Sequence, residues 1–170
     1  MKKRIIITII VFILFFQSEA QDYLRTVGIR NGNYSGITGR LMFNDQIALE
    51  GILGWRNHGL VISTLIEKYK PLPFYWADGF QYYYGFGAHF GTGGLDYLDQ
   101  DRSNGVENNL YRRTVFVAGI DGIIGCEYNF AKIPFIIGLE CKPYIETQNV
   151  RNVDMQLFEF ALSIRYKLSF

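Results

Sequence analysis

The end of the chain alternates large apolar residues with polar or small ones over fourteen residues, LFEFALSIRYKLSF. From Phe158 to Phe170 every even-numbered residue is large and apolar, whereas the odd-numbered ones include Glu159, Arg165 and Lys167. Since successive side chains of a strand point to opposite faces, this period of two predicts a β-strand with one apolar and one charged face. Such a strand suits a membrane barrel, with lipid on one side and a polar lumen on the other.

The start of the chain has the three parts of a secretory signal peptide. Residues 2–4 are basic, residues 5–16 form a nearly all-apolar run, and residues 18–20 read Ser-Glu-Ala. A membrane-spanning helix needs about 20 apolar residues, so this run is too short to span a bilayer. We therefore expect a cleaved secretory signal over residues 1–20 and a single mature domain over residues 21–170.

Composition narrows the class of the mature domain. The full chain carries 17 basic and 16 acidic residues, so it lacks the basic excess that is typical of nucleic-acid-binding proteins. Hydrophobic residues make up 49% of the chain, yet no apolar run after residue 20 approaches the length of a spanning helix. The apolar residues are therefore spread by alternation. The abundance of Tyr, Phe and Gly favours strands and tight bends over helices.

Eight segments of the mature chain alternate with a period of two: residues 23–30, 35–43, 46–55, 60–69, 80–90, 113–128, 134–145 and 157–170. Most are close to the roughly 9–11 residues that a tilted strand needs to cross a membrane. A connection with two prolines over residues 70–79 and polar loops over residues 91–112 and 147–155 separate some of them. The pattern predicts an all-β fold, an eight-stranded antiparallel up-and-down transmembrane β-barrel.

The polar faces of these segments carry nearly balanced charges. The basic ones are Arg30, Arg40, Lys142, Arg165 and Lys167. The acidic ones are Glu50, Glu67, Asp121, Glu127, Glu140 and Glu159. An Arg or Lys facing lipid at mid-membrane costs about 2–4 kcal/mol, so five would cost on the order of the whole stability of a domain. These charges must therefore face the lumen, where an eight-stranded barrel has room only for side chains and where we expect them to pair.

Aromatic residues gather near the ends of the predicted strands, as interfacial girdles require. They are Phe43, Trp55, Tyr69, Phe80, Phe90, Tyr128 and Phe170. A soluble barrel would instead bury its apolar residues and would not place opposed charges in its core.

Four stretches, DQIALEGILGW, YYYGFGAHFG, VAGIDGIIGCEY and ALSIRYKLSF, make the mature chain resemble the small eight-stranded outer-membrane β-barrel proteins of Gram-negative bacteria. The resemblance implies an outer-membrane location and roles in envelope integrity, adhesion or host contact. It also implies that the barrel-assembly machinery recognises the end of the chain, with Tyr166, Leu168 and Phe170 as the apolar positions of the signal. These roles are expectations from the family alone.

Candidates for catalysis are few. Of the two histidines, His58 and His89, the second has lumen parity, as does Ser63. Nothing in the pattern places Ser63 beside His89, as a Ser/His/acid triad would require. We expect His89 to be a hydrogen-bonded lumen residue and predict no catalytic residue.

No cofactor or metal is predicted either. Residues 85–91 mimic a dinucleotide fingerprint, but with one residue too many and no helix to follow. Residues 99–105 are similar to a calcium-binding loop, but the glycine is one position late and Leu110 stands where a bidentate Glu belongs.

The two cysteines, Cys126 and Cys141, fall on adjacent predicted strands of an exported chain, so a disulfide must be considered. If residues 128–136 form the hairpin, Cys126 lies opposite about residue 138, and an offset of three residues strains a disulfide. The alternative is two small apolar residues facing lipid. The pattern leaves both open.

The function that the sequence favours is a non-enzymatic outer-membrane barrel with a structural or surface-interaction role. Its expected partners are outer-membrane lipid and a surface partner bound through residues 91–112, with no nucleic acid. Three alternatives remain: a lipid-modifying barrel enzyme, a ligand-binding barrel of the periplasm and a narrow channel.

Overall fold

The computed structural model describes residues 25–32, 34–56, 59–72, 79–98, 110–148 and 152–168. The expected signal peptide and Phe170 lie outside them. The described residues form ten strands: β1 (Arg25–Gly32), β2 (Ser35–Asn44), β3 (Ile47–Arg56), β4 (Gly59–Pro71), β5 (Phe80–Leu98), β6 (Leu110–Asn129), β7 (Phe135–Cys141), β8 (Tyr144–Gln148), β9 (Asn152–Gln156) and β10 (Phe160–Leu168). No helix long and apolar enough to cross a membrane occurs among these residues.

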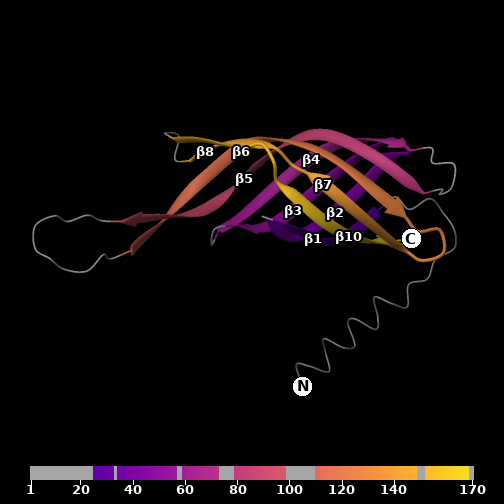
Figure 1. Ribbon diagram of the computed structural model, residues 1–170, viewed down its shortest axis with the longest axis horizontal. Helices are drawn as coiled ribbons and strands as arrows, with labels where there is room; N and C mark the ends of the chain where they lie inside the picture. Colours follow the sequence, from indigo (N-terminus) through magenta and orange to yellow (C-terminus); the bar gives the residue numbers. More distant parts are fainter. Residues whose placement is uncertain are drawn as a thin grey trace, which may run out of the picture.

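The strands close into one barrel (Figure 1). Their order is β5-β4-β3-β2-β1-β10-β7-β6-β8-β9, and the additional pairing of β5 with β6 completes the ring. β7 and β8 follow one another along β6, and β9 and β10 follow one another along β8 and β7, so each pair occupies one position in the wall. Every pairing is antiparallel. The prediction of an all-β, eight-stranded antiparallel barrel is confirmed.

The two broken strands have separate causes. β7 and β8 keep one register along β6 and are interrupted at Pro143, which lacks the N–H that a ladder needs. Between β9 and β10 the pairing shifts by one residue, so that residues 157–159 lie opposite residues 142–143. This is a β-bulge. It leaves Leu157 and Phe158 both exposed and turns the side chain of Glu159 into the barrel.

Two predicted loops are shorter in the structure than the sequence pattern suggested. β5 continues to Leu98 and β6 begins at Leu110, so much of the predicted loop 91–112 is a paired hairpin. β9 lies within the predicted loop 147–155 and pairs with β8. Both predictions relied on loss of apolar alternation. A main-chain ladder does not need that alternation once a strand leaves the apolar belt.

The barrel has two distinct ends. We call the end where β1 begins and β10 stops the terminal end, and it also carries the β2–β3 turn, where Asn44 Oδ1 accepts hydrogen bonds from the backbone N–H groups of Gln46 and Ile47 at 2.9 and 2.8 Å. We call the opposite end the hairpin end. There β5 and β6 run on past the other strands (Figure 1).

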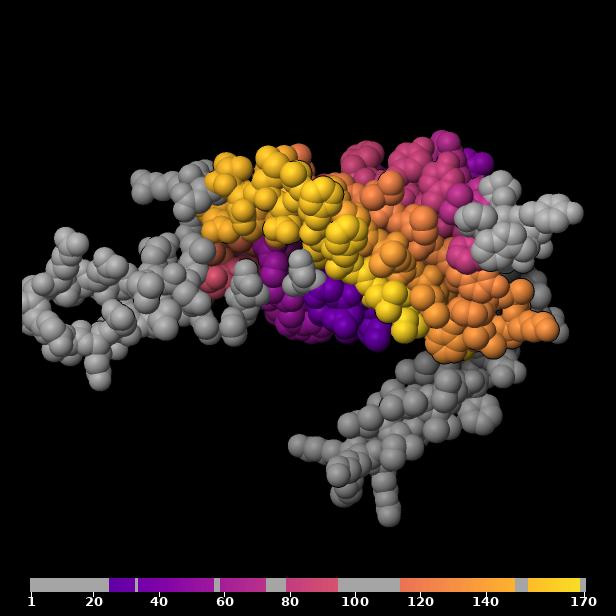
Figure 2. Space-filling view, in the orientation of Figure 1, coloured from indigo at the N-terminus to yellow at the C-terminus, as the bar shows by residue number. Residues whose placement is uncertain are grey.

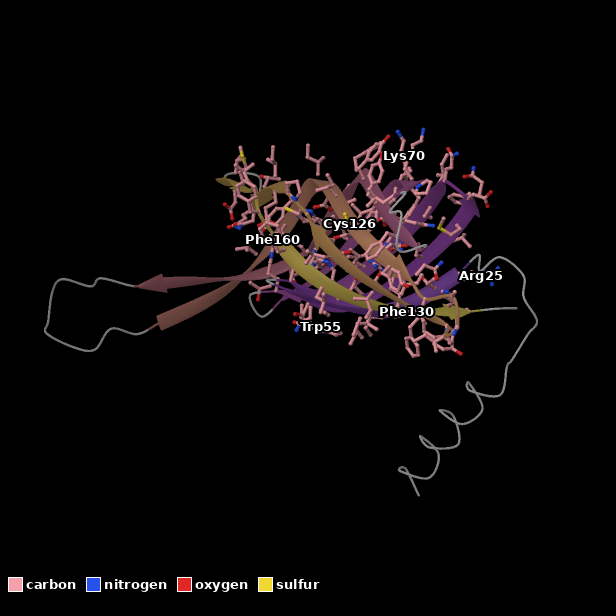
Figure 3. The ribbon with its side chains drawn as sticks, turned by 45° about the vertical axis from the view of Figure 1, so that its right-hand side comes forward. Arg25, Trp55, Lys70, Cys126, Phe130 and Phe160 are labelled. Carbon is pink, nitrogen blue, oxygen red and sulfur yellow. The ribbon has the colours of Figure 1, made fainter. Side chains whose placement is uncertain are left out.

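The outer face of the wall is apolar on every strand. Exposed and buried residues alternate along the middle of the strands, as on β4, where Leu60, Ile62 and Ile66 are exposed while Ser63 and Leu65 are buried. In the space-filling view β10 crosses the visible face obliquely, with its side chains closely packed against those of its neighbours (Figure 2). Trp55 and Phe160 lie on the outer side (Figure 3).

Charge is nearly missing from this outer face. Among strand residues whose side chains the structure describes, the charged ones with outward parity are Arg25, Lys68 and Lys70. All three lie at the terminal end. An apolar belt that is charged only at its margin matches a wall surrounded by hydrocarbon.

The structure places some of the predicted girdle residues on the outer face and Tyr69 in the interior. Phe43, Trp55 and Phe90 are exposed on the outer face. Tyr69 is only 2% exposed, because it shares the inward parity of Glu67 on the same strand. Its position near a strand end suggested a girdle, but parity decides the face. Phe80 and Tyr128 are half-buried and pack against one another with ring centroids 4.7 Å apart.

Candidate functional site: the charged interior

Inward parity brings most of the predicted lumen charges into the sealed interior. Those that are buried are Arg30, Arg40, Glu50, Glu67, Asp121, Glu127, Glu140, Lys142, Glu159 and Arg165. Lys167 is half-buried at the terminal end, where its Nζ donates to the carbonyl oxygen of Phe130 at 2.8 Å. The structure adds Arg56 and Glu146 to the set. Among the described residues, this interior set comprises six basic and seven acidic side chains besides His89.

The charges near the terminal end form what we call the lower cluster: Arg40, Arg165, Glu50, Glu67 and Glu127. The guanidinium of Arg40 contacts three carboxylates, with distances of 3.0 Å to Glu50, 3.2 Å to Glu67 and 2.8 Å to Glu127. Arg165 Nη2 lies 2.8 Å from the other oxygen of Glu50. One planar donor group therefore ties three strands together, which a single ammonium could not do with the same geometry.

Two tyrosines complete the lower cluster. Arg40 lies over the rings of Tyr69 and Tyr83, 5.0 and 5.1 Å from their centroids. The two rings stack with centroids 5.0 Å apart, and Tyr69 donates to Glu67 at 2.6 Å. Tyr83 lies against the backbone of Gly125, where a Cβ atom would come within 2.5 Å of the ring. Glycine at this position therefore makes room for the aromatic side chain on the next strand.

Glu140 joins the lower cluster to the rest of the interior. It accepts hydrogen bonds from Tyr83 at 2.7 Å and from Arg165 at 3.1 Å, and it is also paired with Arg30. Arg30 in turn reaches Glu159 at 2.8 Å. The bulge that turns Glu159 inward thus supplies a carboxylate to the middle of the network.

A second group, the upper cluster, lies toward the hairpin end: Arg56, His89, Asp121, Lys142 and Glu146. The two ring nitrogens of His89 lie 2.8 Å from Asp121 and 3.1 Å from Glu146. Lys142 donates to Asp121 at 2.7 Å, and Arg56 is paired with Glu146. Each carboxylate therefore has a cationic partner as well as the imidazole.

A small cavity lies among the side chains of the upper half of the barrel. It offers about 10 Å³ to the centre of a water molecule, which is room for about one water. Its lining includes His89, Lys142 and Glu159. The ion pairs among the described interior side chains fit the expectation that an eight-stranded barrel is filled by its own side chains.

The geometry of His89 bears on the enzyme alternative. The expectation that nothing places Ser63 beside His89 is wrong, because the two are cross-strand partners on β4 and β5. Both ring nitrogens of His89 are nevertheless engaged by carboxylates, and Ser63 Oγ lies 3.5 Å from the hydroxyl of Tyr34 instead. The residues therefore do not form the base–nucleophile contact that acyl transfer needs.

The structure also places the remaining candidates. Within the described residues there is no group of three or more side chains that could hold a metal ion. The calcium-like loop 99–105 lies outside the described part. Cys126 and Cys141 are free thiols. Cys126 lies opposite Leu139, and Cys141 lies opposite Ile124. The two cysteines are therefore offset by two residues along the β6–β7 ladder.

The sequence interpretation missed several interior residues at strand ends. Arg56 lies one residue beyond the predicted strand 46–55, but it continues the inward parity of Ile52 and Gly54. Glu146 lies between the predicted strand 134–145 and the predicted loop 147–155, but it continues the inward parity of Lys142 and Tyr144. Extending the period of two by one residue beyond the end of each of these predicted strands identifies both interior residues.

No protein-family model matches the chain, and no curated protein matches it. Among solved structures, the chain is similar to the crystal structure of the N-terminal β-barrel domain of Pseudomonas aeruginosa OprF. The two share 15% sequence identity with a TM-score of 0.49, and the match covers 85% of this chain and 95% of that one. The barrel architecture of this chain rests on its own strand pairing.

Proposed function

We propose that this chain is a non-enzymatic outer-membrane β-barrel with a structural or surface-interaction role and a lumen closed by paired charges. One observation carries the proposal: large apolar side chains are exposed on every strand of the barrel, while most of the charges lie in the interior. A soluble barrel has the opposite distribution, since burying charges while exposing apolar surface costs free energy on both counts. In lipid the same arrangement is favourable.

The interior supports a structural role over the alternatives. Transport would need an open lumen, whereas the two clusters and Glu140 fill this one with ion pairs. A lipid-modifying enzyme would need a base at the wall or rim, whereas His89 is 3% exposed and held by two carboxylates. The signal peptide over residues 1–20 and the assembly signal at Tyr166, Leu168 and Phe170 belong to this proposal as the route to the membrane.

The projecting hairpin is the proposed contact surface. β4 pairs with β5 as far as Gly91, and β8 pairs with β6 as far as Val117. Beyond these rungs, residues 92–98 pair with residues 110–116. A two-stranded ribbon is marginally stable alone in water, and its edges offer unpaired backbone groups to a partner.

Residues 21–170, folded into detergent micelles, should migrate differently on a gel before and after boiling. A closed antiparallel ladder leaves no edge from which SDS could start to unravel the barrel, so the folded form should persist in SDS until it is heated. The measurement is electrophoretic mobility with and without boiling. An unchanged mobility together with good solubility in plain buffer would contradict the membrane assignment.

Replacing residues 96–107 with a short turn should leave the heat-dependent mobility shift unchanged, because the shortened hairpin lies beyond the barrel wall. We expect adhesion of cells that display the protein to fall to the level of cells without it. The control is the protein with its full hairpin, displayed in the same system. Unchanged adhesion would refute the hairpin as the contact surface.

A further inference from the structure

Two lysines and two tyrosines alternate on the outer face of β4 and β5 at the terminal end. Lys68 lies opposite Tyr84, and Lys70 lies opposite Tyr82, on adjacent antiparallel strands. Both lysines are exposed, Tyr84 is 43% exposed and Tyr82 is half-buried. We call these four residues the Lys–Tyr patch. Lys70 lies at the outer surface of the barrel in Figure 3.

The two lysines of the patch lie apart from the carboxylates that the structure describes. Among the described residues, neither Lys68 nor Lys70 takes part in an ion pair. The exposed carboxylate of Asp45 belongs to the β2–β3 turn, which is bound to β4 through the hydrogen bond from Tyr69 N–H to the carbonyl oxygen of Gln46 at 2.7 Å. Asp45 forms no ion pair with either lysine. Two cationic side chains without a carboxylate partner among the described residues therefore lie at this point of the outer face.

The patch lies at the margin of the apolar belt. The next outward positions toward the hairpin end are Ile66 on β4 and Phe86 on β5, which are directly opposite each other and 49% and 70% exposed. Long lysine side chains at such a boundary extend their charge toward water while their methylene groups cover apolar surface. Tyrosine favours the same boundary because its ring is apolar and its hydroxyl polar.

We propose that the Lys–Tyr patch binds the phosphate group of an anionic glycerophospholipid in the membrane leaflet at the terminal end. The two ammonium groups and the two phenolic hydroxyls supply the charge and the donors that a phosphate oxygen accepts. The exposed surface of Ile66 and Phe86 continues from the patch in the direction of the lipid tails. This inference rests on the proposed membrane location.

The test uses the folded mature protein in non-ionic detergent, titrated with phosphatidylglycerol or phosphatidylcholine of the same chain length and followed by native mass spectrometry. A lysine near an anionic lipid surface contributes roughly fivefold in affinity. The dissociation constant for phosphatidylglycerol should therefore rise by roughly fivefold in each of Lys68→Gln and Lys70→Gln, and further in the double variant. The constant for phosphatidylcholine should stay unchanged.

Lys132→Gln is the matched control, since Lys132 is exposed in the β6–β7 turn at the same end of the barrel. It should leave both constants unchanged. A second measurement needs no variant: binding of phosphatidylglycerol to the wild-type protein should weaken when salt is raised from about 0.05 to 0.5 M, because exposed charges are screened.

Equal affinity of the wild-type protein for the two lipids would overturn the proposal, as would an equal loss in Lys132→Gln. A lysine dependence seen with lipid A but not with phosphatidylglycerol would overturn it as well. Failure of the proposed function can be distinguished from failure of the patch proposal. If the proposed function is wrong, the wild-type protein itself lacks the heat-dependent mobility shift. A normal shift without lipid selectivity would refute the patch alone.

Discussion

Replacing Arg165 with methionine should lower the free energy of unfolding by about 3–5 kcal/mol, because it removes one of the two cationic partners of each of the buried carboxylates Glu50 and Glu140. Arg165 is fully buried, and its guanidinium lies 2.8 Å from Glu50 and 3.1 Å from Glu140. Methionine fills much of the same volume without charge. The loss is therefore electrostatic rather than a cavity effect. The measurement is urea unfolding in lipid vesicles, followed by gel mobility.

Two further variants test this cause. Glu140→Gln added to Arg165→Met removes one of the two carboxylate charges that lost a cationic partner, so the double variant should be more stable than the sum of the two single changes predicts, by at least about 1 kcal/mol. Ile164→Leu changes the neighbouring outward residue and should cost less than about 1.5 kcal/mol. A cost for Arg165→Met that is no larger than the cost for Ile164→Leu would show that the lower cluster is wet rather than sealed.

Much of this interior could be predicted from the sequence because one rule, the period of two, assigns every strand residue to a face. This rule alone, without the strand pairing, predicts that Arg30, Glu50 and Arg165 face the lumen. Which charges meet could not be predicted. Arg165 and Glu50 are 115 residues apart and come together only when β1 and β2 lie between β10 and β3.

The bulge between β9 and β10 shows where the rule fails. Leu157 and Phe158 are consecutive and apolar, and a strict period of two would turn one of them inward. The extra residue in the ladder lets both face outward. The pair of adjacent large apolar residues was the available signal, but it suggested the start of a strand rather than a bulge within one.

For a related reason, the sequence pattern predicts a loop over residues 91–112, where the structure has a long paired hairpin. Residues 91–98 are rich in glycine and polar residues, which in a barrel usually marks the end of a membrane strand. Among the residues whose side chains are described, Phe90 and Phe116 are the last large apolar outward residues on β5 and β6 toward the hairpin end. Hydrogen bonding between the two strands continues beyond the belt. Alternation therefore reports the extent of the apolar environment, not the length of the strand.

Ile120→Arg should destabilise the folded barrel in lipid vesicles by about 2–4 kcal/mol, the cost of a cation near the bilayer midplane. Ile120 lies midway along the outward face of β6, between Ala88 and Ile145 on its two neighbouring strands, and is 65% exposed. The measurement is the free energy of unfolding in vesicles by urea titration. The guanidinium has no partner at this depth, since the nearest outward charges lie at the terminal end.

Ile47→Arg is the depth control for this prediction. Ile47 also faces outward, but it lies opposite Lys68 at the terminal end, where an added Arg should cost at most about 1 kcal/mol. The difference between the destabilisation caused by Ile120→Arg and that caused by Ile47→Arg shows whether lipid or water surrounds the wall. In water both changes would put a charge on an exposed apolar surface, and neither would destabilise the fold appreciably. Equal and small costs would therefore refute the membrane assignment, whereas a cost that increases with depth requires hydrocarbon around the middle of the barrel.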